Sequence, residues 1–369
     1  MPSDRPLRHV AFYLPQFHPI AENDEWWGPG FTEWINVARG DPLFRGHQQP
    51  HLPADLGFYD LRLPETRSAQ AELATNHGID AFCYFHYWFN GRQLLERPVN
   101  EVLRSGEPSL PFCLCWANEN WTRAWDGKST EVLIEQRYSP EDDLAHIRAL
   151  AEVFADPRYL RIDGRPVFLV YRAFRLPDAR RFADVWRTEA RRLGVGELYL
   201  CDVNGGPEQV LDPEAHGMDA AVAFAPFFGL SAVSDSKLSR VVRKTVRSNS
   251  AYARHRIYDY ATVVQDNLDR PIPQCKVFPG VSPGFDNSPR RPADATILKG
   301  STPALYEQWV RKTVERFEPY SAEENLVFVN AWNEWAEGNH LEPDQKHGRS
   351  FLEAVRQAKN QFGSSPQNE

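Results

Sequence analysis

The chain has 369 residues, and 42 Lys and Arg against 50 Asp and Glu give it a formal net charge of −8 at pH 7. This mixed, mildly acidic charge argues against nucleic-acid binding, and no apolar stretch is long enough to span a bilayer. The five cysteines all fall in apolar runs, which is typical of buried, reduced thiols. No apolar signal segment precedes the first such run, so we expect a cytoplasmic protein.

Strands and helices are predicted to alternate along most of the chain. Apolar, β-branched or aromatic runs predict strands at residues 9–15, 79–85, 111–116, 166–171, 198–203, 220–224, 275–281 and 326–332. Apolar residues at helical spacing predict helices at 64–77, 93–103, 140–154, 177–193, 303–317 and 348–362, with a weaker one at 207–216. Such alternation favours parallel pairing through right-handed crossovers. We therefore predict an α/β fold, a single (β/α)8 TIM barrel with long loops over residues 1–362, followed by a polar tail at 363–369.

In such a barrel the carboxyl ends of all strands meet on one rim, where active sites lie. The residues at these predicted ends are unusually polar and aromatic for a folding core. They are Tyr13, Gln16 and His18, then His86, Tyr87 and Trp88, then Trp116, Asn118, Glu119, Asn120 and Trp121, then Tyr171, Arg172, Asp202, Asn204, Phe285 and Asp286. Their gathering on one rim indicates a binding or catalytic site.

The last predicted strand ends in Trp332, Asn333, Glu334, Trp335, Ala336 and Glu337. Carboxyl groups beside apolar rings are desolvated, which raises the pKa of one and separates a pair into acid and base roles. Indole faces stack on sugar rings, and amides and acids bind sugar hydroxyls. Glu334 and Glu337 are therefore the predicted catalytic residues of an enzyme acting on an oligosaccharide or polysaccharide. The alternative is that both acids stabilise a helix N-terminus.

Other residues are predicted to bind the substrate. Indole rings are candidate stacking platforms, or else buried core; they are Trp34, Trp88, Trp116, Trp121 and Trp332. Acidic side chains are candidate acceptors for sugar hydroxyls, or else salt-bridge partners of arginines such as Arg123 or Arg172; they are Glu33, Glu119 and Asp202. The predicted set is completed by Tyr13, Gln16, His86, Tyr87, Asn118, Asn120, Tyr171 and Asn333.

No metal ion and no cofactor are expected. His18 and His86 have no local partner at metal-ligand spacing, so we expect them to hydrogen-bond to substrate. Cys113 and Cys115 have the wrong spacing for a zinc knuckle and are predicted to lie in the core.

Six segments of the chain resemble the WbsX-like proteins, a group related to the family 99 glycoside hydrolases, the endo-α-mannosidases. They are residues 11–18, 27–34, 78–82, 86–88, 115–121 and 333–338. The resemblance extends from about His9 to about Phe362 and implies a (β/α)8 barrel that acts on saccharides. Many WbsX-like members are labelled glycosyltransferases of lipopolysaccharide or other surface-polysaccharide synthesis.

The resemblance to family 99 also implies a mechanism. Glu334 would act as base on the sugar's own 2-hydroxyl, which attacks the anomeric carbon to give a 1,2-anhydro sugar. Glu337 would protonate the leaving oxygen and then activate water, with net retention. An i, i+3 pair on one turn lies on one face, which suits a base that reaches the 2-hydroxyl.

Three function classes stay open: a retaining α-glycosidase, a glycosyltransferase of O-antigen or exopolysaccharide synthesis, and a catalytically silent sugar-binding barrel. The sequence has no glycine-rich phosphate loop and no Asp-x-Asp metal motif, which favours the hydrolase. A cytoplasmic location favours synthesis, and the intact Glu pair argues against the silent barrel. The basic segment at 236–256 is a solvated helix face, or else a lid for an acidic glycan or a peripheral contact with a lipid-linked glycan at a membrane surface.

Overall fold

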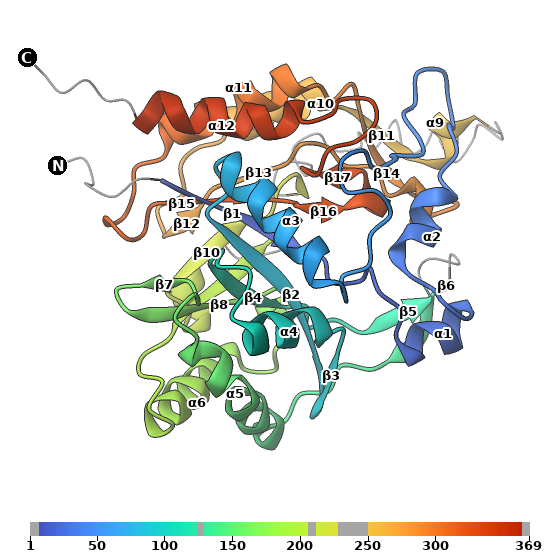
Figure 1. The fold of residues 1–369 in the computed structure, drawn as a ribbon. Helices are drawn as coiled ribbons and strands as arrows, with labels where there is room; N and C mark the ends of the chain where they lie inside the picture. Colours follow the sequence, from blue (N-terminus) through green and yellow to red (C-terminus); the bar gives the residue numbers. More distant parts are fainter. Residues whose placement is uncertain (1–6, 124–127, 206–211, 228–249, 364–369) are drawn as a thin grey trace, which may run out of the picture.

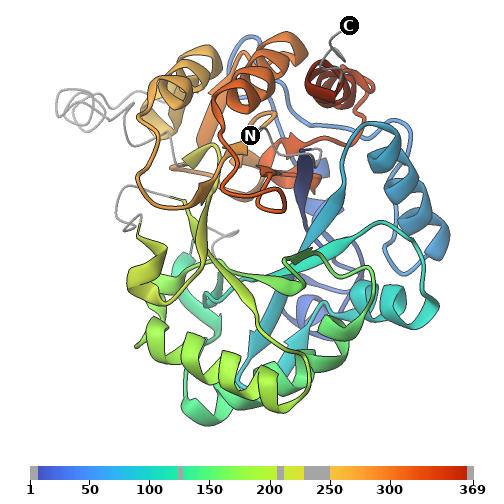
Figure 2. The same cartoon turned by 90° about the vertical axis from the view of Figure 1, so that its left-hand side faces the viewer.

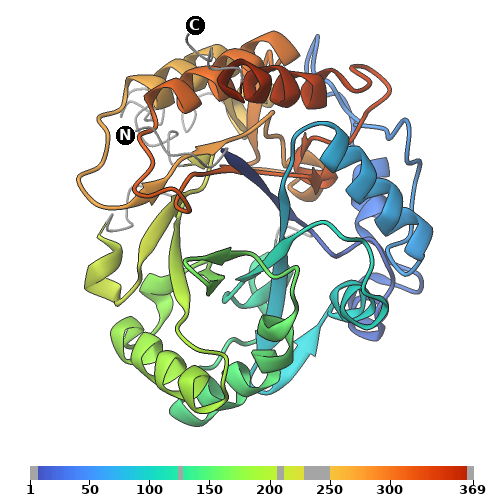
Figure 3. The same ribbon diagram turned by 60° about the vertical axis from the view of Figure 1, so that its left-hand side comes forward.

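Nine parallel strands form the wall of a nearly closed barrel in the computed structural model, which describes residues 7–123, 128–205, 212–227 and 250–363 (Figure 1). Their order in the sheet is β12-β10-β9-β8-β4-β2-β1-β15-β13. The bounds are β1 (Arg8–Tyr13), β2 (Ala81–Phe89), β4 (Phe112–Trp116), β8 (Arg165–Val170), β9 (Tyr199–Asn204), β10 (Ala220–Ala223), β12 (Val277–Phe278), β13 (Gly280–Val281) and β15 (Leu326–Val329). The predicted (β/α)8 barrel is confirmed, and helices surround the strands in the end-on views (Figures 2 and 3).

The barrel closes at its seventh strand, which is divided. β12 pairs with β10 and β13 pairs with β15, so the strand expected at 275–281 is two short pieces on either side of Pro279. The Pro279 carbonyl accepts a hydrogen bond from the Phe328 amide at 2.9 Å. A Cβ atom on Gly280 would lie 1.9 Å from the Ala223 carbonyl oxygen. Only glycine permits this close approach, and the approach brings the two edges of the sheet together.

The outer helices begin where the sequence provides capping residues. Ser139, Asp178 and Thr302 each accept a backbone N–H of the first turn of the helix that follows, an interaction that contributes about 1 kcal/mol. The helices are α3 (Pro64–Asn76), α4 (Arg97–Ser105), α5 (Pro140–Ala155), α6 (Ala179–Arg192), α10 (Tyr260–Asp269), α11 (Pro303–Arg316) and α12 (Ser350–Gly363). No helix among the described residues is long and apolar enough to cross a membrane.

Shorter elements differ from the predictions. The helix expected at 93–103 starts at Arg97, because β3 (Arg92–Leu94) pairs antiparallel with the end of β2. The long loop after β1 contains α1 (Ala21–Trp27) and α2 (Glu33–Ala38), which no helical pattern predicted. Of the expected helix at 207–216, the described part is η3 (Pro213–His216). Most of the basic segment at 236–256 lies outside the described residues; its end forms α9 (Ala251–Arg254) and begins β11 (Arg256–Asp259).

Further small elements lie in the remaining loops. They are β5 (Trp121–Arg123), β6 (Lys128–Ile134), β7 (Arg161–Ile162), η2 (Ala173–Arg175), η4 (Ser288–Arg290), β14 (Thr296–Lys299), β16 (Asn333–Glu334), η5 (Trp335–Glu337) and β17 (Asn339–His340). The five cysteines are free. Four of them are buried in strands, and Cys275 lies just before β12 and is half-buried.

Candidate active site

The two predicted catalytic glutamates lie on a tight hairpin directly after β15. β16 pairs antiparallel with β17, and η5 joins them. Asn333 fixes the hairpin to the end of β1, because its side-chain oxygen accepts from the Leu14 amide at 2.7 Å and its side-chain nitrogen donates to the Leu14 carbonyl at 3.0 Å. Asn333 is fully buried. Its role is therefore to position the hairpin, and a substrate does not reach it.

A single arginine joins both glutamates to a third acid. Arg290 Nη2 lies 3.1 Å from Glu334 Oε2 and 2.9 Å from Glu33 Oε2, and Arg290 Nη1 lies 2.7 Å from Glu337 Oε1. We call these four residues the carboxylate cluster. Glu33 begins α2 and Arg290 ends η4, so the cluster joins loops that follow the first, seventh and eighth barrel strands.

The carboxylate cluster is buried and rich in negative charge, which changes its protonation. Burial raises the pKa of Glu334 to about 8, with repulsion from Glu337 and Glu33 adding to the effect and Arg290 opposing it. Burial also raises the pKa of Glu33 against the attraction of Arg290. Burial alone would lower the pKa of Arg290, but the three carboxylates raise it, so the guanidinium stays charged. Burial therefore favours the protonated form of Glu334.

Several predicted binding residues surround this cluster. Tyr87 accepts a hydrogen bond from Gln16 at 3.1 Å, and the charges of Glu334 and Glu33 act on its pKa, which burial raises. The Tyr171 ring packs against Phe85 inside the barrel, and among smaller effects the charge of Glu337 acts on its pKa, which burial raises. The structure therefore brings Glu33, Gln16, Tyr87 and Tyr171 together with the glutamate pair.

A cavity of about 180 Å³ lies beside Gln16, and aromatic side chains line it. Its walls include Trp121 and Asn120, together with the half-buried Trp26 and Trp27 of α1. The Trp121 ring lies 5.1 Å from the Tyr87 ring and 5.8 Å from that of Trp26. Trp26 and Trp27 were missing from the predicted site, although adjacent tryptophans in a polar loop are a signal that could have found them.

Other predicted binding residues point away from the barrel centre, because side chains alternate along a strand. Tyr13 donates to Gln70 of α3, His86 lies 2.8 Å from His146 of α5, and Trp88 donates to Asp142 of α5. Trp116 donates to the Trp88 carbonyl and stacks on Phe182 of α6. These side chains are buried between the strands and the outer helices. The expectation that Tyr13, His86, Trp88 and Trp116 bind the substrate is corrected accordingly.

Further predicted residues are buried or have structural partners. Trp34, Trp332 and His18 are buried; Trp34 donates to the Tyr59 carbonyl and Trp332 packs on Phe82. Asp202 is buried and lies 3.1 Å from His216. Asn118 bonds to both backbone groups of Arg172, and Asn120 accepts from the Gln136 amide. Glu119 lies 3.5 Å from Arg172 and 3.3 Å from Arg175, so the salt-bridge alternative holds for it.

Arg290 is a further site residue that sequence reasoning missed. It follows Ser288 and Pro289 in an irregular loop, where no periodic pattern or motif marks it. Its contacts depend on the closure of the barrel, and its partner Glu334 lies 44 residues further along the chain. No local signal in the sequence identifies it.

A parallel (β/α)8 barrel with paired acids at the carboxyl ends of its strands is an architecture that carbohydrate-active enzymes use. The chain belongs to the glycosyltransferase WbsX family, whose model matches residues 9–355. Two relatives, each called uncharacterized protein WxcX, come from Xanthomonas campestris pv. campestris strains B100 and ATCC 33913. Each is 46% identical over 359 residues, which are 97% of this chain and 50% of the relative. The chain therefore spans about half the length of these relatives.

Solved structures share the fold. The GH99 endo-alpha-mannosidase from Bacteroides thetaiotaomicron is 14% identical, with a TM-score of 0.57, over 96% of this chain and 97% of that chain. A glycoside hydrolase-like protein is 13% identical, with a TM-score of 0.55, over 97% of this chain and 95% of that chain. At this level of identity the likeness extends to the barrel alone.

Proposed function

We propose that the chain is a retaining α-glycosidase of the endo-α-mannosidase type, in which Glu334 and Glu337 carry out the chemistry. The observation that carries this proposal is the contact of one guanidinium, that of Arg290, with both carboxyl groups. Both acids therefore face the same small region. Ordinary retaining enzymes place two carboxyl groups about 5 Å apart on opposite sides of the bond, one of them as nucleophile. A pair on one side suits a base for a neighbouring hydroxyl.

In the proposed reaction, ionised Glu334 removes the proton of the sugar's 2-hydroxyl, and that oxygen attacks the anomeric carbon. Glu337 donates a proton to the leaving oxygen as the glycosidic bond breaks, and a 1,2-anhydro sugar forms. Glu337 then takes a proton from water, whose oxygen opens the anhydro ring, and Glu334 returns its proton to the 2-oxygen. Two inversions at the anomeric carbon give net retention.

The charge state of the cluster bears on these roles, because burial favours a proton on Glu334 at rest. A carboxyl group with a pKa of about 8 is a stronger base than an ordinary glutamate once it is ionised. The resting group holds a proton, so the active form requires Glu334 to lose it and Glu337 to carry one. The two groups interact, and the proton belongs to the pair. A 2-hydroxyl that donates a hydrogen bond to Glu334 favours the ionised form.

The second candidate function is a glycosyltransferase of lipopolysaccharide, O-antigen or exopolysaccharide synthesis. The description of the family favours it. In that case the same cluster would transfer the sugar to an acceptor hydroxyl, and the basic segment at 236–256 would meet a lipid-linked glycan. A nucleotide-sugar donor needs a phosphate-binding site, and the sequence contains neither a glycine-rich phosphate loop nor an Asp-x-Asp motif. The hydrolase is therefore our first choice.

The deciding experiment is to incubate the protein with a panel of α-linked manno-oligosaccharides, with and without nucleotide sugars. Hydrolysis without a nucleotide sugar, lost in Glu334→Gln and Glu337→Gln variants, is expected. The anomeric form of the first product, read by NMR, reports retention. A strict requirement for a nucleotide sugar would show that the protein is a glycosyltransferase and not a hydrolase. Glycan binding that both variants retain, with no turnover under either condition, would indicate a silent sugar-binding barrel.

A further inference from the structure

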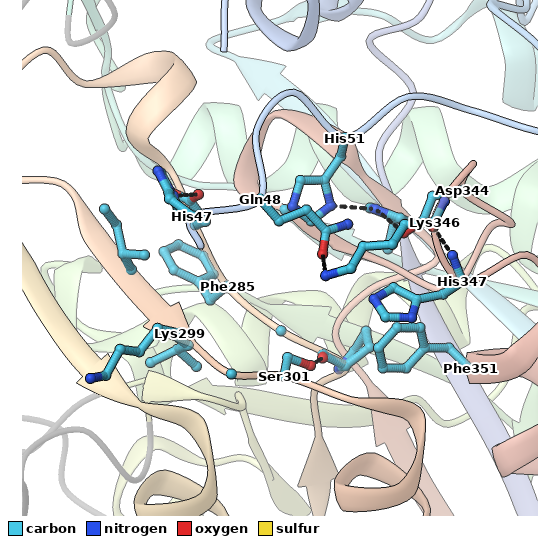
Figure 4. Close-up of a pocket in the computed structure, with 18 of the residues that line it drawn as sticks. His47, Gln48, His51, Phe285, Lys299, Ser301, Asp344, Lys346, His347 and Phe351 are labelled. Carbon is cyan, nitrogen blue, oxygen red and sulfur yellow. Dashed lines mark hydrogen bonds and ion pairs between the residues drawn. The ribbon is translucent and has the colours of Figure 1, made fainter. Parts of the chain in front are cut away.

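Two histidines and an aspartate converge at the hairpin that carries the glutamates, and none of them belongs to the carboxylate cluster. His51 Nδ1 lies 3.0 Å from His340 Nε2, and Asp344 Oδ2 lies 3.8 Å from the same nitrogen. His51 and Asp344 are labelled in Figure 4. One potential metal-ligand atom from each residue falls within 4.8 Å of the others. His51 lies in the loop between α2 and α3, and the other two residues lie in and just after β17. The three side chains thus join segments that are far apart in sequence.

The hydrogen bonds around the cluster orient its ligand atoms inward. His340 Nδ1 donates to the Glu342 carbonyl at 2.9 Å, so its Nε2 presents a lone pair toward His51 and Asp344. The His340 ring also stacks on Trp335, with ring centroids 3.7 Å apart. Asp344 Oδ1 accepts the backbone amides of Lys346 and His347 at 2.9 and 2.6 Å, which holds Oδ2 on the side of His340. Metal-binding histidines are oriented in this way by a carbonyl partner on the second ring nitrogen.

Two of the three separations between ligand atoms are close to those around a tetrahedral ion, and the third is no more than 4.8 Å. Ligand atoms at about 2.0–2.1 Å from a tetrahedral Zn²⁺ lie about 3.3 Å from one another. The observed separations of 3.0 and 3.8 Å lie on either side of this value. Two imidazoles and one carboxylate suit Zn²⁺ and its first-row neighbours, whereas Mg²⁺ and Ca²⁺ prefer oxygen ligands only.

The cluster opens into a cavity of about 120 Å³, which His47, Ser301 and His347 also line. The labelled side chains surround this space in Figure 4. It has room for a water molecule as the fourth ligand, which is the arrangement of a three-ligand zinc site. The geometry points to a site for one divalent first-row metal ion, of the zinc class, with His51, His340 and Asp344 as its protein ligands.

The bound ion would hold the catalytic hairpin from behind. His340 is the pairing partner of Asn333, next to Glu334, so a metal joins the His51 loop to the hairpin that carries both glutamates. None of the four residues of the carboxylate cluster lines this cavity, so we assign the ion no part in the reaction. Its role is to position the hairpin.

The test uses the full chain without a purification tag, stripped of metal with a chelator and titrated with Zn²⁺ by calorimetry. We expect one Zn²⁺ per chain, and at least tenfold weaker binding in His51→Asn and in Asp344→Asn. His216→Gln is the matched control, because it alters another His–Asp pair, His216 with Asp202, and should bind Zn²⁺ as the wild type does. Zn²⁺ should raise the Tm of the wild type, whereas Mg²⁺ and Ca²⁺ should not.

Cobalt gives a readout that does not depend on the variants folding. Co²⁺ added to the metal-free wild type should produce visible absorption bands of the intensity typical of tetrahedral coordination, and Zn²⁺ should displace them at one equivalent. The site is wrong if the wild type takes up no Zn²⁺, or if folded His51→Asn and Asp344→Asn variants bind it as tightly as the wild type.

Discussion

Arg290 Nη2 lies 3.1 Å from Glu334 Oε2, so the buried acid proposed as the base already has a cation beside it. The same guanidinium reaches Glu337 and Glu33. One guanidinium thus faces three carboxyl groups, and burial favours a proton on Glu334. This arrangement holds the pair in one orientation and sets its charge.

The first prediction separates the roles of the two glutamates. Glu337→Gln should lower the turnover of substrates with poor leaving groups by about 10²–10⁴-fold, because the departing oxygen then receives no proton. Activated aryl glycosides need that proton less and should keep more activity. Glu334→Gln should lose both activities, and a substrate without its 2-hydroxyl should bind without being cleaved. Steady-state kinetics measure the changes; a trapped glycosyl ester on either Glu would contradict the mechanism.

The second prediction concerns pH and uses the Glu337→Gln variant with an activated aryl glycoside, so that only Glu334 titrates among the proposed pair. A raised pKa means that Glu334 is protonated at low pH and ionises as the pH rises toward about 8. If it is the base, kcat/KM should rise with pH and then level off. Loss of the Glu337 charge removes one repulsion that raises the pKa of Glu334. The pH at the midpoint of the rise in kcat/KM should therefore be lower in this variant than in the wild type. A kcat/KM that falls with rising pH would make Glu334 the acid instead.

The third prediction is that Arg290 stabilises the fold. Arg290→Met leaves buried acids without their cation, and removing one partner of a buried pair costs about 3–5 kcal/mol. The loss should be smaller at low pH, where the carboxyl groups are protonated. Urea denaturation at several pH values measures the free energy of unfolding. Arg291→Met is the matched control, because its side chain is exposed and should change stability little. An equal effect of both substitutions would argue against the cluster.

The fourth prediction compares Trp88, near the end of β2, with Trp121, the first residue of β5. Their side chains face different ways. Trp88→Phe should lower stability by about 1–3 kcal/mol, because buried Asp142 loses a hydrogen bond, and should leave KM unchanged. Trp121→Ala should raise KM for the glycan, because a stacking surface beside Gln16 is lost. Thermal unfolding and steady-state kinetics test the pair. The opposite pattern would place the substrate on the other side of β2.

The strands, most of the helices and the position of the glutamate pair could be predicted from the sequence, because all of them depend on local patterns. The orientation of strand-end residues could not. β2 is buried on both faces, so its composition does not distinguish Tyr87, which faces the barrel centre, from His86 and Trp88, which face α5. The alternation of side chains along a strand shows only that Tyr87 points to one face of the sheet and that His86 and Trp88 point to the other. The contacts of Arg290 and of His51 depend on long-range packing, which local patterns do not reveal.

The carboxylate cluster lies where the last strands of the chain meet the first. Glu33 follows β1, Arg290 follows β13, and Glu334 follows β15, and these strands are neighbours in the order β13-β15-β1. During synthesis on the ribosome, the contacts that join Glu33 to Arg290 and Glu334 therefore form only after the seventh and eighth strands have been translated and have joined the sheet. A nascent chain with six strands has no assembled carboxylate cluster, so the proposed turnover of a sugar substrate would report the moment at which the barrel becomes complete.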